Sequence, residues 1–209
     1  ATKPAADIPA LLKGGYFFDR KESLNIAGPK SGLAFPSLTG YMNALFDGSD
    51  GLLLVTIMDV PYKASQGTKV YERDGLTIYT LGILHGDGPC LAYRIESSEG
   101  VIVVSADQNG SNPAFIDFAK GADILLMPLA IHEEADEVSS FMHAKPSIVG
   151  QIAAEVNPKL LVLTHWMGLG LKLKPASIKI VKEYYYGQVI AGNDLSSYPM
   201  SAVKEMSHE

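Results

Sequence analysis

Three short runs of apolar residues in the second half of the chain constrain its fold more than any other feature. The runs are Val101–Ser105, Asp123–Met127 and Leu160–Thr164, and each is almost wholly aliphatic. Such runs are typical of strands that are buried on both faces of a sheet. The segments between them, Pro113–Lys120 and Pro146–Val156, have the spacing and start signals of helices. This alternation predicts an α/β fold in which helices cover a sheet.

The middle of the chain contains strands without intervening helices. We expect strands at Thr68–Glu72, Leu76–Leu84 and Cys90–Glu96. The last of these forms a hairpin with Val101–Ser105 through the turn Ser97–Gly100. Strands joined by such short turns pair in the antiparallel sense, so the sheet is expected to be antiparallel or mixed here.

The other elements are assigned from the same signals. Helices are predicted at Asp7–Gly15, ended by its glycine pair, at Phe35–Phe46 and at Ser177–Tyr186; strands are predicted at Leu24–Ala27, Leu52–Met58 and Val189–Ala191. The acidic segment His132–Ser140 is interpreted as a loop and the tail after Pro199 as frayed. No linker or repeat divides the chain, so residues 1–209 are expected to form a single domain.

Charge and composition argue against several classes of protein. The formal net charge of −6 gives no overall attraction to nucleic acid or to an anionic membrane. No apolar run is long enough to span a bilayer, and the first ten residues lack a signal peptide, although an exported mature form would look the same. The single cysteine, Cys90, lies in an apolar strand and is interpreted as a buried side chain rather than a nucleophile. We therefore expect a cytoplasmic protein without membrane contact.

Histidines and an aspartate stand where a sheet exposes its ligand-binding edge. Asp107 follows one apolar run and His165 follows another, and residues just beyond the carboxyl ends of such strands line the crevice of a sheet. His85 and Asp107 also stand at opposite ends of the hairpin, where they can face each other. Imidazole and carboxylate groups are suitable ligands for zinc, manganese or iron. The alternative for each histidine is a structural, hydrogen-bonded role, and His132 with Glu133 is interpreted as a solvated acidic turn.

Several segments together resemble a known superfamily. The segments ILHGDGPCLAYRIE, GVIVVSADQN and FMHAKPSIVGQIAAEVNPKLLVLTH occur in this order. Their order and content are similar to the later part of metallo-β-lactamase-fold hydrolases, especially the ribonuclease Z-like branch. The likeness is most specific between His85 and His165. It implies an αββα sandwich, a divalent metal cofactor such as zinc, with manganese or iron as alternatives, and a metal-activated water as nucleophile.

The resemblance also implies roles for four residues. His85, ahead of Ala92–Ile95, matches a metal-binding histidine of the family. Asp107 stands in S-A-D-Q where the family has S-G-D-T, whose aspartate bridges two metal ions. His165 ends an L-T-H motif and matches the last metal-binding histidine. His143 resembles a histidine that contacts the scissile phosphate or acts as general acid, with a helix cap or a solvent-exposed residue as the alternative.

One family motif has no counterpart in this chain. The principal metal motif, H-x-H-x-D-H, does not occur, and Ala1–Pro4, where the family places its last residues, holds neither histidine nor carboxylate. The first strands of the sandwich are accordingly expected to be lacking. Either the chain is the C-terminal portion of a longer protein, or it is a degenerate member with half a site. We expect the former, with the preceding segment supplied in cis or by another chain of a homo-oligomer.

Two functional hypotheses follow from these expectations. The first is a metal-dependent hydrolase of small-molecule or phosphodiester substrates, with His85, Asp107 and His165 as metal ligands and Asp107 and His143 as catalytic residues. The second is a non-catalytic module of the same fold that serves binding or oligomerisation. Nucleic acid is possible as a substrate, but the acidic net charge argues against a dedicated tRNA-processing enzyme.

Overall fold

The computed structural model describes residues 8–32, 35–46 and 55–205 of the chain. The helices are α1 (Ile8–Phe17), α2 (Leu38–Leu45), α3 (Ala114–Ala119), α4 (Glu137–Met142), α5 (Pro146–Val156), α6 (Gly168–Lys172), α7 (Lys174–Tyr184) and α8 (Met200–Lys204). The strands are β1 (Leu24–Pro29), β2 (Val55–Val60), β3 (Thr68–Arg73), β4 (Leu76–His85), β5 (Gly88–Ser97), β6 (Gly100–Val104), β7 (Ile124–Pro128), β8 (Leu160–Thr164) and β9 (Gln188–Ala191). None of the helices in these ranges is long and apolar enough to cross a membrane.

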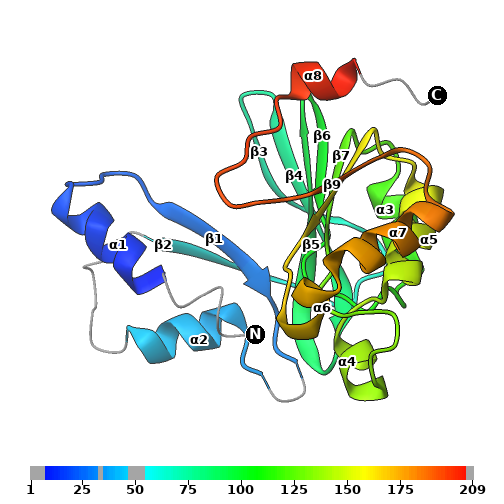
Figure 1. Ribbon diagram of the computed structural model, residues 1–209. Helices are drawn as coiled ribbons and strands as arrows, with labels where there is room; N and C mark the ends of the chain where they lie inside the picture. Colours follow the sequence, from blue (N-terminus) through cyan, green and yellow to red (C-terminus); the bar gives the residue numbers. More distant parts are fainter. Residues whose placement is uncertain (1–7, 33–34, 47–54, 206–209) are drawn as a thin grey trace.

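A seven-stranded mixed sheet forms the centre of the molecule (Figure 1). Its strands follow the order of the chain, β3-β4-β5-β6-β7-β8-β9. The first four strands pair in the antiparallel sense, because tight turns join them. The strands from β6 to β9 pair in parallel, because helical segments return the chain to the same end of the sheet. The mixed sheet expected from the sequence is confirmed.

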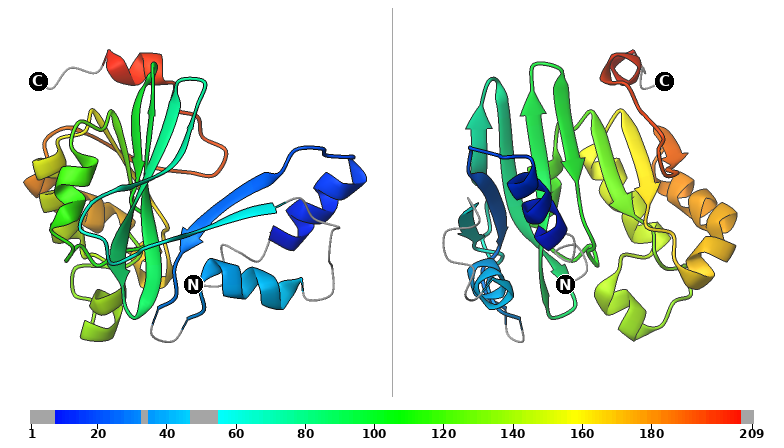
Figure 2. Two further views of the ribbon diagram at one scale, coloured as in Figure 1. Left: turned by 180° about the vertical axis from the view of Figure 1, so that it is seen from behind. Right: turned by 90° about the vertical axis from the view of Figure 1, so that its left-hand side faces the viewer.

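Helices α3, α5 and α7 cover one face of this sheet (Figures 1 and 2). The core lies between the two layers, because β4 to β8 alternate in the direction of their side chains and send one set towards the helices. Fully buried residues of this core include Leu81, Ile83, Val103, Leu125, Met127, Leu161 and Leu163 from the strands and Phe115, Val149, Ala153 and Val181 from the helices. This packing holds the strand ends at fixed positions.

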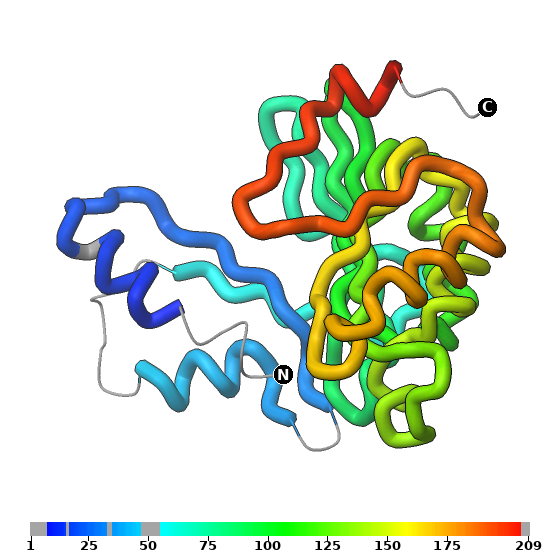
Figure 3. The backbone as a smooth tube through the Cα atoms, viewed as in Figure 1, coloured from blue at the N-terminus to red at the C-terminus, as the bar shows by residue number. Residues whose placement is uncertain are grey.

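A second, smaller sheet lies on the other side of the molecule. β1 and β2 pair in parallel from Leu24 with Val55 to Pro29 with Val60. The pair diverges from the large sheet, with α1 and α2 beside it (Figures 1 and 3). Each sheet is thus accompanied by its own helices, so the predicted α/β fold of the αββα type is confirmed, with two strands in the second sheet of the described chain.

The C-terminal segment packs on the face of the large sheet that α3, α5 and α7 leave uncovered. Val203 of α8 is 1% exposed and contacts a cluster formed by Ile124, Leu160 and Val162. Tyr198 and Met200 are partly buried against the same cluster. The expectation of a frayed tail is therefore wrong for residues 199–205.

Two predictions for the first half of the chain are also corrected. The glycine pair does not end α1, which continues to Phe17 because Gly14 and Gly15 still accept backbone hydrogen bonds from Phe18 and Arg20. The segment predicted as the buried strand Leu52–Met58 is described only from residue 55. There β2 alternates between half-buried and exposed residues, and Met58 is 44% exposed.

Three short helices were not predicted. α4 begins within the acidic segment His132–Ser140, which the sequence predicts as a loop, and ends two residues beyond it. α6 and α8 have five residues each. Helices of one or two turns bury too few residues to leave a recognisable apolar period in a sequence.

Candidate metal centre

Two of the predicted site residues follow parallel strands at one edge of the large sheet. β6 ends at Val104 and β8 ends at Thr164, and β7 pairs in parallel with both. The carboxyl ends of these strands therefore meet at the same edge. Asp107 and His165 come just beyond these ends, and His165 Nε2 lies 3.5 Å from Asp107 Oδ2. The strand-end argument correctly predicted that these two side chains would be brought together.

The backbone turns sharply beside both residues. Ala106 has a φ of 52° and His165 has a φ of 57°, so each adopts the left-handed conformation. This conformation costs roughly 1–2 kcal/mol for a residue with a Cβ atom, and such strained residues cluster at functional sites. The strain persists here because the buried strands on either side fix the course of the chain. The turn at His165 follows directly on the hydrogen-bonded end of β8.

His85 is the last residue of β4 and approaches Asp107 from the other side. Its Nε2 atom lies 3.9 Å from the same oxygen, Asp107 Oδ2. Its Nδ1 atom lies 2.7 Å from the carbonyl oxygen of Met142, at the end of α4. Because a carbonyl only accepts hydrogen bonds, Nδ1 carries a proton, which leaves Nε2 as the ring nitrogen on the side of Asp107. This is the arrangement that orients a metal-binding imidazole.

His143 completes the group from the C-terminal end of α4. Its ring centroid lies 4.9 Å from that of His85 and 5.6 Å from that of His165. Burial lowers the pKa of the imidazole below its usual value; Asp107 opposes this shift, and His85 and His165 add to it. His143 is therefore half-buried rather than fully in solvent, and the N-cap position of α5 is Lys145. Nδ1 of His143 is a buried ring nitrogen without a hydrogen-bond partner among the described residues.

The donor set suits a divalent metal ion. One donor atom each from His85, Asp107 and His143 lies within 4.8 Å of the other two. Two ligands of one tetrahedral zinc ion lie roughly 3.4 Å apart, given bonds of about 2.1 Å, so these side chains need only small adjustments to share an ion. The sequence-based set was His85, Asp107 and His165; the compact group has His143 instead, and His165 contacts Asp107 from a more exposed position. The individual roles stay predictions.

Residues that the sequence analysis passed over hold the loop that carries Asp107. Asn109 donates its backbone N–H to the Leu84 carbonyl at 2.8 Å and its side-chain amide to the Phe141 carbonyl at 3.0 Å. The Gln108 carbonyl accepts from the Ala144 N–H at 2.8 Å, next to His143. These contacts tie the loop to β4 and α4. Most of their partners are backbone groups, so no side-chain motif signals them.

Cys90 lies beside the site without the properties of a nucleophile. Its side chain is partly buried and packs against the main core. Burial raises the pKa of the thiol, and the negative charge of Asp107 raises it further. A raised pKa keeps the thiol protonated near neutral pH, whereas a nucleophile or metal ligand is a thiolate. The interpretation as a small core residue therefore agrees with the structure.

Glu133 is not part of a merely solvated turn. Its carboxylate accepts hydrogen bonds from the backbone N–H of Ser147 at 2.9 Å and from the Ser147 hydroxyl at 2.6 Å. Ser147 lies in the first turn of α5, so Glu133 caps that helix from a distant loop. The earlier interpretation is corrected: this acidic residue stabilises the helix that begins three residues after His143.

Comparison with solved structures identifies the fold. The chain is similar to the metallo-β-lactamase-fold protein YhfI from Bacillus subtilis, with a TM-score of 0.68 and 22% identity over 90% of this chain and 69% of that one. It is similar to the short form of human tRNase Z, with a TM-score of 0.67 and 14% identity over 90% of this chain and 71% of that one. A diphosphatase from the PhnP family matches with a TM-score of 0.50 and 16% identity over 69% of this chain and 47% of that one.

The protein thus has the metallo-β-lactamase fold, as the sequence resemblance predicted. Comparison with protein-family models gives no match, and comparison of the sequence with curated proteins gives none either. The inference of the fold from segment order and strand-end residues was therefore correct where overall sequence similarity carried no signal.

Proposed function

We propose that the protein is a metal-dependent hydrolase that cleaves phosphodiesters at the site formed by His85, Asp107, His143 and His165. The observation that carries the proposal is the convergence of two imidazoles on one carboxylate oxygen. His85 Nε2 and His165 Nε2 lie 3.9 Å and 3.5 Å from Asp107 Oδ2. Three histidines and one carboxylate, of which His85, Asp107 and His165 stand at strand ends and His143 at the end of α4, form a donor set typical of hydrolytic metal centres.

The similar structures support a hydrolase and the choice of substrate class. One of them is a tRNase Z and another is a diphosphatase, so both act on phosphate esters or anhydrides. The net charge of −6 disfavours a long polyanionic substrate and favours a small phosphodiester. Zinc is the proposed metal because imidazole nitrogen dominates the donor set, with manganese and iron as alternatives. Homo-oligomer formation, a single domain over residues 1–209 and a cytoplasmic location stay predictions.

In the proposed mechanism the protein groups hold and orient the reacting atoms. A divalent ion in such a site polarises the phosphoryl group and lowers the pKa of a coordinated water molecule. Asp107 would supply negative charge to balance such an ion, and the hydrogen bond from His85 Nδ1 to the Met142 carbonyl fixes the orientation of the imidazole that would bind it. The Asp107 loop is held by Asn109, which limits movement of the carboxylate.

His143 has two possible tasks in this mechanism. Because burial lowers its pKa, the neutral imidazole predominates near pH 7. A neutral imidazole binds a metal ion through one nitrogen or donates one N–H to a phosphoryl oxygen. The general-acid role expected from the resemblance requires the protonated form, whose fraction grows as the pH falls.

The test combines metal analysis with one defined substrate. The purified chain is expected to bind zinc and to hydrolyse bis(p-nitrophenyl) phosphate. Asp107→Ala is expected to lose the metal and to lower kcat/KM by at least about a hundredfold, since loss of a direct ligand costs more than loss of a group that only orients one. Asp194→Ala, at an exposed position away from the cluster, is the matched control.

The same experiment can also contradict the proposed hydrolase activity. A chain that neither binds zinc, manganese or iron nor hydrolyses the diester in their presence would contradict the proposal. That result would favour the alternative, a non-catalytic module of this fold that serves binding or oligomerisation. Equal losses in Asp107→Ala and Asp194→Ala would show a general effect on folding and would also count against the assigned site.

A further inference from the structure

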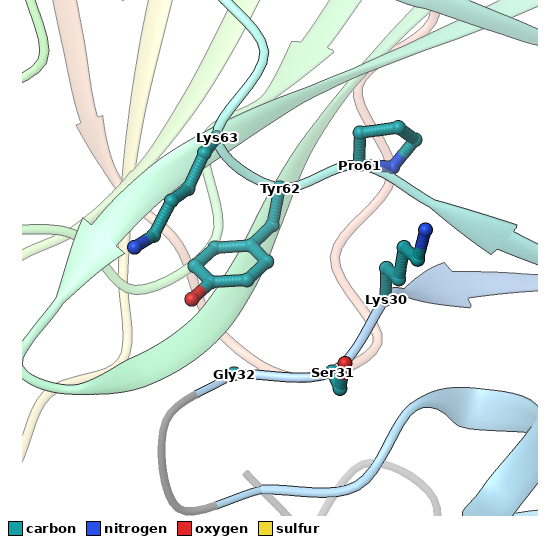
Figure 4. Close-up of a pocket in the computed structure, with 6 residues that line it drawn as sticks. All are labelled: Lys30, Ser31, Gly32, Pro61, Tyr62 and Lys63. Carbon is teal, nitrogen blue, oxygen red and sulfur yellow. The ribbon is translucent and has the colours of Figure 1, made fainter.

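A pocket of about 370 Å³ lies between the two segments that leave β1 and β2. The first segment is Lys30–Gly32 and the second is Pro61–Lys63 (Figure 4). A volume of this size is within the range of roughly 300–1,000 Å³ that small-molecule sites occupy. The site residues His85, Asp107, His143 and His165 do not line it, so it is a separate feature of the molecule.

The polar side chains that line the pocket are hydrogen-bond donors and cations. Lys30 and Lys63 contribute two ammonium groups, and neither has an ion-pair partner among the described residues. Ser31 and Tyr62 contribute hydroxyl groups, and Figure 4 shows the Tyr62 ring between the side chains of the two lysines in this view. Among the described residues, no carboxylate lines the pocket. Lys63 Nζ lies 5.7 Å from the centroid of the Tyr62 ring, a cation–π contact that leaves its charge without a carboxylate partner. Two such ammonium groups beside two hydroxyl donors favour an anion with several acceptor oxygens.

The backbone of both segments is held in place, so the pocket is formed without a ligand. The Lys30 N–H donates to the Val60 carbonyl at 2.7 Å, which joins the two segments at their start. The Tyr62 carbonyl packs directly on Gly82 of β4, where a Cβ atom would lie 1.5 Å from its oxygen. Only glycine permits this approach. The second segment is therefore seated on the large sheet.

The pocket also borders the hairpin that carries His85. A Cβ atom at Gly32 would lie 3.1 Å from the ring of Pro89 in β5. Pro89 pairs with Leu84, and the next pair along the hairpin is His85 with Gly88. In Figures 1 and 2 the end of this hairpin lies between helix α4 and the chain that leaves β1. The carbonyl of Met142, the last residue of α4, accepts a hydrogen bond from His85. The pocket therefore lies beside the same β4–β5 hairpin whose end carries His85.

We propose that the pocket between Lys30–Gly32 and Pro61–Lys63 binds a phosphoryl group. A phosphate monoester carries close to two negative charges at neutral pH and three strong acceptor oxygens, which match two ammonium groups and two hydroxyls. Lysine suits this task because it binds phosphate as a point charge without requiring a planar partner. The binding of phosphate here depends on these six residues and not on the proposed hydrolysis.

Binding is tested with inorganic phosphate as the probe. Titration of the ¹⁵N-labelled Asp107→Asn chain excludes phosphate held by the metal centre and is expected to shift the amide resonances of Gly32 and Lys63 in a saturable way. Lys30→Ala and Lys63→Ala are each expected to weaken the affinity roughly tenfold, the effect of losing one charge-assisted hydrogen bond. Lys30→Arg is expected to keep most of it. Lys179→Ala, an exposed lysine of α7, is the matched control.

The outcomes of this titration separate the alternatives. Shifts that do not saturate, or an unchanged affinity in Lys30→Ala and Lys63→Ala, would overturn the proposal. Equal weakening in Lys179→Ala would also overturn it, because the effect would then come from net charge alone. All three lysines are exposed, so their replacement is not expected to prevent folding.

A second experiment tests whether the pocket contributes to substrate choice, and this part of the inference rests on the proposed function. If the pocket holds a second phosphate of the substrate, Lys30→Ala is expected to raise KM about tenfold for a diester that carries an additional phosphate monoester. KM for bis(p-nitrophenyl) phosphate, which lacks that group, is expected to stay unchanged, as is kcat for both. Equal KM changes for the two substrates would overturn the role in substrate choice, while phosphate binding in the Asp107→Asn chain is judged independently.

Discussion

At the scale of single residues, the candidate metal centre depends on backbone conformations that are costly by themselves. Ala106 precedes Asp107 with a φ of 52°, in the position where the related S-G-D-T motif has glycine. Glycine adopts positive φ without steric cost, whereas alanine does not. The S-A-D-Q variant of this chain therefore carries local strain that the related motif avoids. The hydrogen bonds of Asn109 and Gln108 to neighbouring backbone groups oppose relaxation of this loop.

This strain leads to a prediction for Ala106→Gly. The substitution removes the cost of a left-handed alanine, roughly 1–2 kcal/mol, and adds the greater freedom of glycine in the unfolded chain, roughly 0.5–1 kcal/mol. We expect unfolding in urea to show unchanged or slightly increased stability. Ala154→Gly, at an exposed position inside α5, is the control and is expected to lose about 1 kcal/mol. A loss in Ala106→Gly as large as that in the control would contradict the argument.

At the scale of elements, α5 links the core to the site. Its residues Val149, Ile152, Ala153 and Val156 are buried in the main core, and the helix begins three residues after His143. The first helical N–H groups lack partners within the helix. Glu133, from the loop after β7, accepts from the N–H and the hydroxyl of Ser147 and so fills one of these positions. The position of His143 thus depends in part on a carboxylate from a different loop.

The contribution of this cap to stability is tested by replacing two neighbouring glutamates. Glu133→Ala removes the acceptor of both hydrogen bonds and is expected to lower the free energy of unfolding by about 1–2 kcal/mol. Glu134→Ala removes an exposed carboxylate of the same loop and is expected to change it by less than about 0.5 kcal/mol. Urea unfolding of both variants measures the difference. Equal effects would mean that the cap contributes nothing beyond the charge of the loop.

The elements differ in how much of them could be predicted from the sequence. α5 and β8 match their predicted ranges. For α5, Pro146 marks the first turn and Asn157, in the left-handed conformation, marks the end of the helix. α4 could not be predicted because it has six residues, none of them buried, so no apolar period marks it. The Asp136 side chain accepts from the Ser139 N–H at 2.7 Å at its start, but an aspartate in a segment rich in acidic residues does not single out a helix by itself.

At the scale of the whole molecule, the site is assembled from elements that are distant in the sequence. The rule of strand ends predicted the meeting of Asp107 with His165, and the hairpin predicted that of His85 with Asp107. The family resemblance predicted His143 at the site, but not its place in the compact group with His85 and Asp107. That place follows from the docking of α4, whose Met142 carbonyl is a backbone group without a sequence signal. The same limit applies to α8, whose burial depends on the distant Leu160 and Val162.

The stability of the whole fold is expected to depend on Tyr185 at alkaline pH. Tyr185 follows α7, is 2% exposed and donates its hydroxyl proton to the Pro158 carbonyl, just ahead of β8. Burial raises the pKa of its phenol from 10.0 to about 12. The folded chain therefore holds the proton where the unfolded chain releases it. By linkage, the stabilisation is fully present below the unfolded pKa near 10 and is lost as the pH rises through about 12.

Tyr185→Phe tests this dependence against Tyr186→Phe, whose side chain is 87% exposed. At pH 8 the Tyr185 variant is expected to be less stable than the wild type by about 1–3 kcal/mol, because the Pro158 carbonyl loses its donor. Between pH 10 and 12 the wild type is expected to lose the stability that depends on the protonated phenol, while the variant has no such group to titrate. The gap in unfolding free energy between the two chains should therefore narrow with rising pH in urea titrations. A gap that stays constant or widens, or one that Tyr186→Phe reproduces, would contradict the assignment to this buried phenol.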